Sequence, residues 1–336
     1  MTLAETRGFA SDSSGRYGGM PIGYTLSSEE HRPSLLVEQA VRAEGAGFDF
    51  LMISDHFHPW IDEQGQSPFV WAVIGGIANA TTRIQLGTGV TCPIIRMHPV
   101  IVAQAAATVA DMMDGRFFLG LGTGENLNEH VVGRGWPAAS VRLDMLEESV
   151  QVIRELFSGQ NVDERGSHFT VENARLYTLP ARPPRIMLAA SGPAAAELAG
   201  RMSDGLISTA PDREVVERFE RAGGAGKPRF AQITVCWAET ETEARATAGR
   251  IWPNAGLTGE LTQELPLPRH FEQAVATLSQ DQVAESITCG PDPERYLDAI
   301  RTYENSGFDH IYLHQVGPDQ EGFVSFYRSE LAPNLA

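Results

Sequence analysis

A short polar stretch, Ser54-Asp55-His56-Phe57-His58-Pro59-Trp60, groups residues that can carry out proton transfer. It follows the mostly apolar residues 48–53, which predict a buried strand, so its polar side chains emerge where that strand ends. Asp55 can orient His56, His56 can move a proton near neutral pH, and Trp60 offers a flat face to a ring. The alternative interpretation is that Asp55 caps a short turn and that both histidines are solvated.

Small and polar residues also follow the other predicted strands. Glycines recur there, and a glycine lets the main chain approach a planar or phosphorylated ligand. The amides at the start of the helix that begins at Pro193 can bind an anion. Glu125 can be partly desolvated, which suits proton transfer, although it could instead cap the helix that follows it. The segments concerned are Gly87-Thr88-Gly89-Val90, Gly122-Thr123-Gly124-Glu125-Asn126, Ala189-Ala190-Ser191-Gly192-Pro193, Ser208-Thr209 and His314-Gln315.

Strands and helices alternate along the chain from residue 21 onward. Near-continuous apolar strands, each followed by a helix, predict a parallel sheet covered on its outer face, and eight such units predict an α/β fold of the (β/α)8 TIM-barrel type. One helix is expected to begin with Ser28, Glu29 and Pro33 and to run to about Glu44. Residues 158–180 predict a hairpin insertion, and residues 253–290 predict an irregular one. In such barrels the active site lies at the carboxyl ends of the strands, where the polar segments fall.

Composition excludes several classes of function. A chain of 336 residues that is 42% hydrophobic can bury the core of one barrel, so we expect a single domain over residues 20–336. Residues 1–19 are rich in serine and glycine and lack the apolar segment of a secretion signal, so we expect a flexible tail. A net charge of −17, with Lys227 as the sole lysine, argues against binding to nucleic acid or to an anionic membrane.

The cysteines and histidines show no metal-binding spacing. Cys92, Cys236 and Cys289 lack a CxxC pattern, which is typical of reduced thiols in a cytoplasmic protein. No HExxH pattern is present, so the sequence predicts no metal site.

Taken together, the motifs resemble the coenzyme F420-dependent glucose-6-phosphate dehydrogenases, which belong to the bacterial luciferase-like barrels. The resemblance covers nearly the whole chain from Pro21, in order and with few gaps. It rests on Ser54-Asp55-His56-Phe57 with Trp60, Leu86-Gly87-Thr88-Gly89-Val90, Phe118-Leu119-Gly120-Leu121-Gly122-Thr123-Gly124-Glu125 with Asn128, Ala189-Ala190-Ser191-Gly192-Pro193, and Ser329-Glu330-Leu331-Ala332-Pro333.

The resemblance implies a deazaflavin, coenzyme F420, bound at the barrel mouth against a non-proline cis peptide at Gly89-Val90. It implies that His56 is the base that takes the alcohol proton while a hydride leaves carbon for the ring. Asp55 carries over as a cofactor contact, Trp60 as a stacking group, and Glu125 as the acid near the reduced ring nitrogen. A homodimer is the family expectation. The positions that match groups holding the ring or its lactyl-phosphate tail are Gly89, Val90, Thr123, Gly124, Asn128, Ser191 and Gly192.

The chain departs from the family's pattern where the phosphate of the substrate would bind. The family uses cations there, and the matching positions in this chain are Asp212, Thr262 and Ser286, none of them basic. A dianionic phosphate would lose charge-assisted hydrogen bonds worth about 1.5–3 kcal/mol each, and Asp212 would repel it. We therefore expect a small neutral sugar or another secondary alcohol as substrate. The residues expected to face it are Trp60, Thr209, Asp212, Thr262 and Ser286.

Several alternatives stay open. Arg213 or Arg269 could replace the missing cations, and the reduced deazaflavin could instead reduce a carbonyl or an enone. A luciferase-like monooxygenase would use FMN and oxygen, but the acid, base and indole set supplies alcohol-oxidising chemistry instead. A non-catalytic barrel predicts the loss of the polar groups at the strand ends, which are present.

Overall fold

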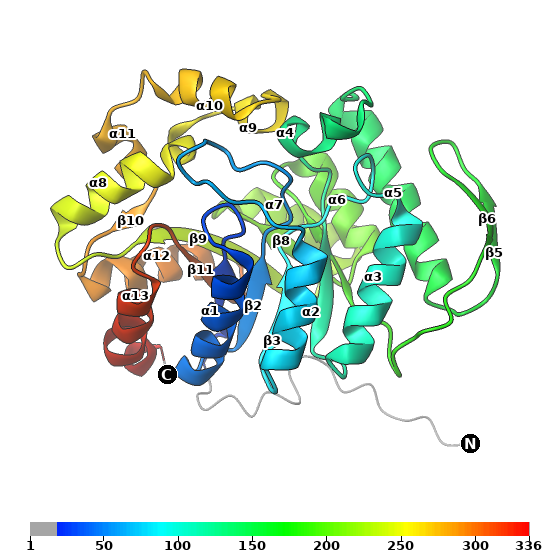
Figure 1. The fold of residues 1–336 in the computed structure, drawn as a ribbon, viewed down its shortest axis with the longest axis horizontal. Coiled ribbons are helices and arrows are strands. Elements are labelled where there is room, and N and C mark those ends of the chain that lie inside the picture. The colour runs from blue at the N-terminus through cyan, green and yellow to red at the C-terminus, as the bar shows by residue number, and fades with distance from the viewer. Residues whose placement is uncertain (1–18, 336) are drawn as a thin grey trace.

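The computed structural model describes residues 19–335, which form a closed barrel of parallel strands (Figure 1). Each strand pairs in parallel with its neighbours, and pairing of β8 with β9 closes the barrel, which confirms the predicted fold. The predicted tail, apart from Gly19, lies outside the described residues. The eight barrel strands are β1 (Ile22–Leu26), β2 (Phe50–Ile53), β3 (Gln85–Thr88), β4 (Phe117–Leu121), β7 (Ile186–Ala189), β8 (Gly205–Ser208), β9 (Arg229–Cys236) and β11 (His310–Gln315).

Large side chains fill the inside of the barrel. Phe50, Phe118, Phe230 and Tyr312 are buried there, and they come from strands spread around the ring. Gly87 lies opposite Phe118 in the register of β3 and β4, where a Cβ would approach the Phe118 ring to 2.1 Å. The interior of the barrel is therefore a packed apolar core at the level of these residues, and the polar groups lie at the carboxyl ends of the strands.

Helices cover the outer face of the barrel, as Figure 1 shows. Their buried residues are mostly alanine, leucine, valine and isoleucine on one side, which pack onto the apolar outer face of the strands. The helices are α1 (Pro33–Ala46), α2 (Val70–Ala80), α3 (Pro99–Met112), α5 (Ala139–Leu156), α6 (Pro193–Met202), α7 (Arg213–Phe219), α8 (Glu241–Ile251), α12 (Pro293–Asn305) and α13 (Gln320–Phe326).

The two predicted insertions differ in kind. The first is a hairpin of β5 (Val162–Arg165) and β6 (Thr170–Ala174), as predicted. The second is more regular than expected, because short helices with good start signals fill it: Pro268 begins one, and Ser279 with Gln282 forms a capping box at another. These elements are α9 (Leu261–Glu264), α10 (Pro268–Val275), α11 (Gln280–Ala284) and the short strand β10 (Thr288–Cys289), which pairs with β9.

The segment after β1 also differs from the prediction. The helix begins at Pro33, not at Ser28 and Glu29, which instead lie in the turn that follows the strand. No helix in residues 19–335 is both long and apolar enough to cross a membrane. In the same residues no three His, Cys, Asp or Glu side chains are grouped so as to hold a metal ion.

Candidate active site

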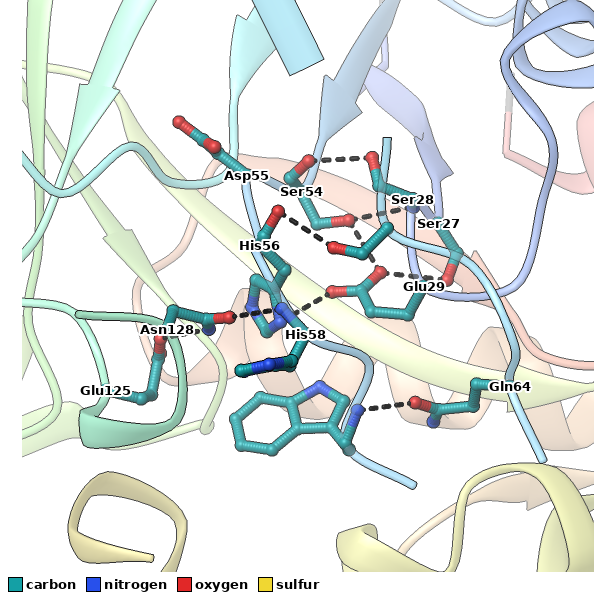
Figure 2. Close-up of polar contacts among 12 residues, drawn as sticks. Ser27, Ser28, Glu29, Ser54, Asp55, His56, His58, Gln64, Glu125 and Asn128 are labelled. Atoms are coloured by element: carbon teal, nitrogen blue, oxygen red, sulfur yellow. Dashed lines mark hydrogen bonds and ion pairs between the residues drawn. The ribbon is translucent and has the colours of Figure 1, made fainter. Parts of the chain in front are cut away.

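The imidazole of His56 lies beside a carboxylate that follows the first strand (Figure 2). Its Nδ1 is 3.2 Å from Oε1 of Glu29, and the two side chains are only 10% and 3% exposed. β1 and β2 are neighbours with Leu26 opposite Ile53, so the turns after the two strands meet. Because Nδ1 faces Glu29, Nε2 is the nitrogen left to exchange a proton with a substrate.

Hydroxyl groups hold the Glu29 carboxylate in place. Ser54 Oγ donates to Oε2 at 2.7 Å and Ser27 Oγ donates to the same oxygen at 3.2 Å. Burial by itself raises the pKa of Glu29, but the charge of His56 and the hydrogen bond from Ser54 outweigh it, so the pKa lies below its ordinary value. An ionised carboxylate at this position stabilises positive charge on His56.

Asp55 does not orient His56, which corrects the simplest interpretation of the sequence. Figure 2 shows its side chain pointing away from the His56 ring. Its Oδ1 is 2.8 Å from Arg96 Nη2, and its Oδ2 accepts a hydrogen bond from Thr91 Oγ1 at 2.7 Å. Arg96 also pairs with the buried Glu129 at 3.4 Å. Asp55 thus belongs to a buried ionic network that fixes Thr91, directly after Val90.

Asn128 joins the turn after β2 to the turn after β4. Its Oδ1 accepts from the main-chain N–H groups of Phe57 and His58 at 2.9 and 3.1 Å, and its Nδ2 donates to Oε2 of Glu125 at 3.3 Å. Glu125 is half-buried and directly precedes α4 (Asn126–Glu129), but its side chain makes no capping hydrogen bond. The His58 ring contacts the carbonyl of Leu127 at 2.9 Å, so this histidine supports the same turn.

The indole of Trp60 stands between His56 and the second insertion. Its ring centroid is 5.1 Å from that of His56 and 5.2 Å from that of Phe271 in α10, both in edge-to-face geometry. Its main-chain N–H donates to Gln64 Oε1 at 2.8 Å. Trp60 is therefore held on two sides, and its half-buried ring borders the proton-transfer pair.

The main chain after β3 and β4 forms the surface next to these groups. The Gly89–Val90 peptide bond is cis, as the resemblance implied, and half-buried Val90 packs on the barrel core. Gly124 has a φ of +69°, and a Cβ there would lie 2.6 Å from Cys92 Sγ, so only glycine fits. Thr123, next to it, is half-buried.

The predicted tail and substrate residues lie farther out. Ser191 is exposed and Gly192 directly precedes α6, where a Cβ on Gly192 would meet no other atom within 4 Å. Thr209 is exposed, and Asp212 is exposed and caps α7, with its carboxylate accepting from Glu214 N–H at 2.8 Å. Half-buried Thr262 is in α9, which Asn126 links to the turn after β4, and exposed Ser286 follows α11.

The structure brings only part of the predicted set together. His56, Trp60, Glu125 and Asn128 form one connected group, whereas within the described residues no hydrogen bond or ion pair joins Asp212 or Ser286 to it. Sequence reasoning missed Glu29 and Arg96. Glu29 lies three residues after the end of β1, as His56 lies three residues after the end of β2, but its position before Pro33 made it resemble the start of a helix. Arg96 does not lie in a polar segment directly after a predicted strand, so no sequence pattern pointed to it.

The barrel, the cis peptide and the acid–base groups at the strand ends define a luciferase-like oxidoreductase. A family model described as luciferase-like monooxygenase matches residues 18–310. A solved F420-dependent secondary alcohol dehydrogenase, in complex with an F420–acetone adduct, is 30% identical and superposes with a TM-score of 0.88 over 95% of this chain and 99% of that one.

The curated relatives place the chain more narrowly. The F420-dependent glucose-6-phosphate dehydrogenase of Nakamurella multipartita is 36% identical over 94% of this chain and 96% of its own length. The enzyme of the same name from Mycobacterium avium is 36% identical over 94% of this chain and 98% of its own length. The chain belongs to the luciferase-like family and, within it, to the group that contains the F420-dependent glucose-6-phosphate dehydrogenases.

Proposed function

We propose that the protein is an F420-dependent dehydrogenase that oxidises a secondary alcohol or a neutral sugar to the carbonyl compound. The His56–Glu29 pair carries this proposal, because a shielded imidazole with a carboxylate on one nitrogen is the arrangement that a general base requires. The relatives act in the same class of reaction, on glucose 6-phosphate or on a secondary alcohol, as their names state.

The residues at the barrel mouth fit a planar ring with an anionic tail. Val90 offers a half-buried apolar surface, with Thr123 and Gly124 on the neighbouring strand end. Open space beside Gly192 at the start of the ten-residue helix α6 suits an anionic tail. Ser191 lies next to it. We assign Gly89, Val90, Thr123, Gly124 and Asn128 to the ring and Ser191 with Gly192 to the tail. Asp55 acts through Thr91 by holding the Gly89–Val90 segment.

The chain's own residues would handle the protons. When bound, F420 supplies the two-electron acceptor for the hydride that leaves the carbinol carbon. His56 Nε2 takes the hydroxyl proton as the C–O bond becomes a carbonyl, and Glu29 stabilises the resulting imidazolium. Glu125, held by Asn128, is the acid on the cofactor side, and Trp60 stacks on the reacting alcohol.

The preferred substrate is proposed to carry no phosphate. Asp212 already caps a helix, Arg213 donates to the carbonyl of Asn305, and Arg96 is engaged by Asp55 and Glu129. Thr209, Thr262 and Ser286 offer hydroxyl groups but no positive charge. Of the two arginines considered as replacements, Arg269, exposed on α10 two residues before Phe271, is the one remaining candidate cation, and a phosphate would therefore find fewer charge-assisted hydrogen bonds than the family's cations supply.

We further propose that residues 20–336 form one domain. We also propose that the protein is a homodimer and that it is located in the cytoplasm. Exposed apolar side chains on neighbouring helices support the dimer: Val41 in α1, Phe69 just before α2 and Ile101 in α3, the last two 60% and 52% exposed. Figure 1 shows α1, α2 and α3 side by side on one flank of the barrel. Light scattering on the wild type and on Ile101→Glu tests this, because the substitution should yield monomers.

The decisive experiment is a titration of the purified protein with oxidised F420, followed by addition of glucose 6-phosphate, glucose and 2-propanol in separate samples. Tight binding, with loss of the deazaflavin absorbance on addition of a neutral alcohol but not of the phosphate, is expected. His56→Ala should keep cofactor binding and lose turnover, whereas the control His168→Ala, in the β5–β6 hairpin, should keep both. Binding of FMN in place of F420 would contradict the proposal.

A further inference from the structure

A second carboxylate–imidazole pair lies next to the His56–Glu29 pair. Glu30 follows Glu29 directly, and its Oε1 is 3.8 Å from Nε2 of His314 at the end of β11. The two side chains are 5% and 3% exposed. The separation is too long for a hydrogen bond, and Oε1 and both ring nitrogens have no hydrogen-bond partner. A buried polar atom without a hydrogen-bond partner destabilises the protein, so a ligand group that forms the missing hydrogen bond would bind favourably there.

Both side chains of the Glu30–His314 pair are fixed from behind. The other carboxylate oxygen of Glu30, Oε2, accepts from the main-chain N–H of Gly317 at 2.8 Å. The His314 ring packs edge-to-face on Trp252, with centroids 4.5 Å apart and an interplanar angle of 83°. These contacts hold the unpartnered atoms facing each other, and because the atoms are buried, a ligand group reaches them only when the side chains that cover them move aside.

The Glu30–His314 pair adjoins the proposed reaction centre. Trp60, which borders His56, packs against the same apolar cluster that contains Trp252, the neighbour of His314. Burial raises the pKa of Glu29 and His56 lowers it, and His314 lowers it as well, so the charge of His314 acts on the carboxylate beside His56. Glu30 and His314 therefore lie next to the carboxylate that serves His56.

We propose that Glu30 and His314 form a subsite for a second hydroxyl group of the substrate, which makes neutral polyols the preferred substrate class. This inference rests on the proposed function. With the covering side chains moved aside, a hydroxyl oxygen can lie about 2.8 Å from both atoms, which are 3.8 Å apart. The hydroxyl donates its proton to Glu30 Oε1 and accepts a hydrogen bond from His314 Nε2. A phosphate dianion has no proton to donate and would face the carboxylates of Glu29 and Glu30.

Matched ring alcohols test the subsite, because their carbon skeleton stays constant. The substrates are cyclohexanol, the 1,2-, 1,3- and 1,4-cyclohexanediols and 4-aminocyclohexanol, each oxidised by the F420-loaded enzyme. At least one diol should exceed cyclohexanol in kcat/KM by about 10-fold or more. His314→Phe keeps the contact with Trp252 and removes both nitrogens, so it should lower the diol-to-cyclohexanol ratio of kcat/KM by about 10- to 100-fold. Glu30→Leu should do the same, and Glu38→Gln, an exposed change on α1, should not.

A binding measurement separates this inference from the proposed function. Tryptophan fluorescence of the F420-loaded His56→Ala variant should report binding of the preferred diol without turnover, and adding His314→Phe should weaken that binding. Weakened binding without any alcohol oxidation by the wild type would support the subsite and overturn the proposed function. Equal kcat/KM for diols and cyclohexanol, unchanged in His314→Phe, would mean that the pair binds water only and would overturn the subsite. A preference for the amino alcohol over every diol would overturn the assignment to a hydroxyl.

Discussion

Replacing Glu29 with glutamine tests how much the buried carboxylate contributes to proton transfer. Glutamine has nearly the same shape and can still accept from Ser54, whose Oγ donates to Glu29 at 2.7 Å, but it presents no charge to His56 at 3.2 Å. The two side chains form an ion pair, since His56 Nδ1 makes no hydrogen bond in this geometry. If the contact tightens to a hydrogen bond when the imidazolium forms, a charge-assisted bond contributes about 1.5–3 kcal/mol and a neutral one about 0.5–1.5 kcal/mol, so the loss is about 1–2 kcal/mol. If this loss falls on the imidazolium formed in the transition state, kcat decreases by about 5- to 30-fold.

The assay is a double-mutant cycle on kcat for a secondary alcohol, followed by loss of the deazaflavin absorbance. His56→Ala should lower kcat by about 10²- to 10⁴-fold. Because Glu29 acts through His56, the double variant should be no slower than His56→Ala alone. Glu148→Gln is the control: its carboxylate also accepts main-chain hydrogen bonds, from His168 and Phe169, but it lies away from His56. A double variant slowed by the product of the two single effects would refute the reasoning, since Glu29 would then act independently.

Three further predictions concern charge, thiols and pH. Asp212→Lys combined with Ser286→Arg should raise kcat/KM for sugar phosphates by about 10-fold or more, since each restored charge-assisted contact is worth about 1.5–3 kcal/mol; no gain would show that these positions do not face the phosphate. Burial raises the pKa of all three cysteine thiols, that of Cys289 to about 11, so the native protein should resist iodoacetamide at pH 8 while the urea-unfolded protein reacts at all three; rapid native labelling would count against this packing. The pKa of Glu29 is lower in the folded chain than its ordinary 4.5, so its ionised form stabilises the fold above that pH, and the stabilisation is lost as pH falls through the folded-state pKa. The unfolding free energies of the wild type and Glu29→Gln should therefore converge below about pH 4.5, and a constant difference between pH 7 and pH 3 would contradict the assignment.

The barrel could be predicted from the sequence because its strands are short apolar runs at regular spacing. The run that ends at Ile53 and the one before Gly122 both predicted where polar side chains emerge, and His56 and Glu125 do follow those strands. Residues 253–290 could not be predicted equally well. Their short helices depend on local caps such as Ser279 and on packing of Phe271 against Trp60, and a tertiary contact of that kind leaves no periodic signal.

The partner of His56 could not be predicted, because it comes from a different strand. Proximity in sequence favoured Asp55, yet consecutive residues after a strand need not point the same way, and Arg96 holds the Asp55 carboxylate. Glu29 is brought to His56 by the pairing of β1 with β2, with the whole of α1 lying between them in the sequence. Which carboxylate serves an imidazole is thus decided by strand order, which the sequence pattern predicts only in outline.

The two sides of the proposed reaction centre are built from different parts of the barrel. The groups assigned to the cofactor follow β3, β4 and β7, and those after β3 and β4 are tied to the turn after β2 by Asn128 and by the Arg96 network. The groups assigned to the substrate follow β1, β2 and β11 and border the second insertion, where Phe271 supports Trp60, while Trp252, just before that insertion, supports His314. Changes in that insertion can therefore alter which alcohol binds without disturbing the ring-binding main chain. This separation explains how a chain that keeps the family's acid and base residues can lack the cations of its phosphate site.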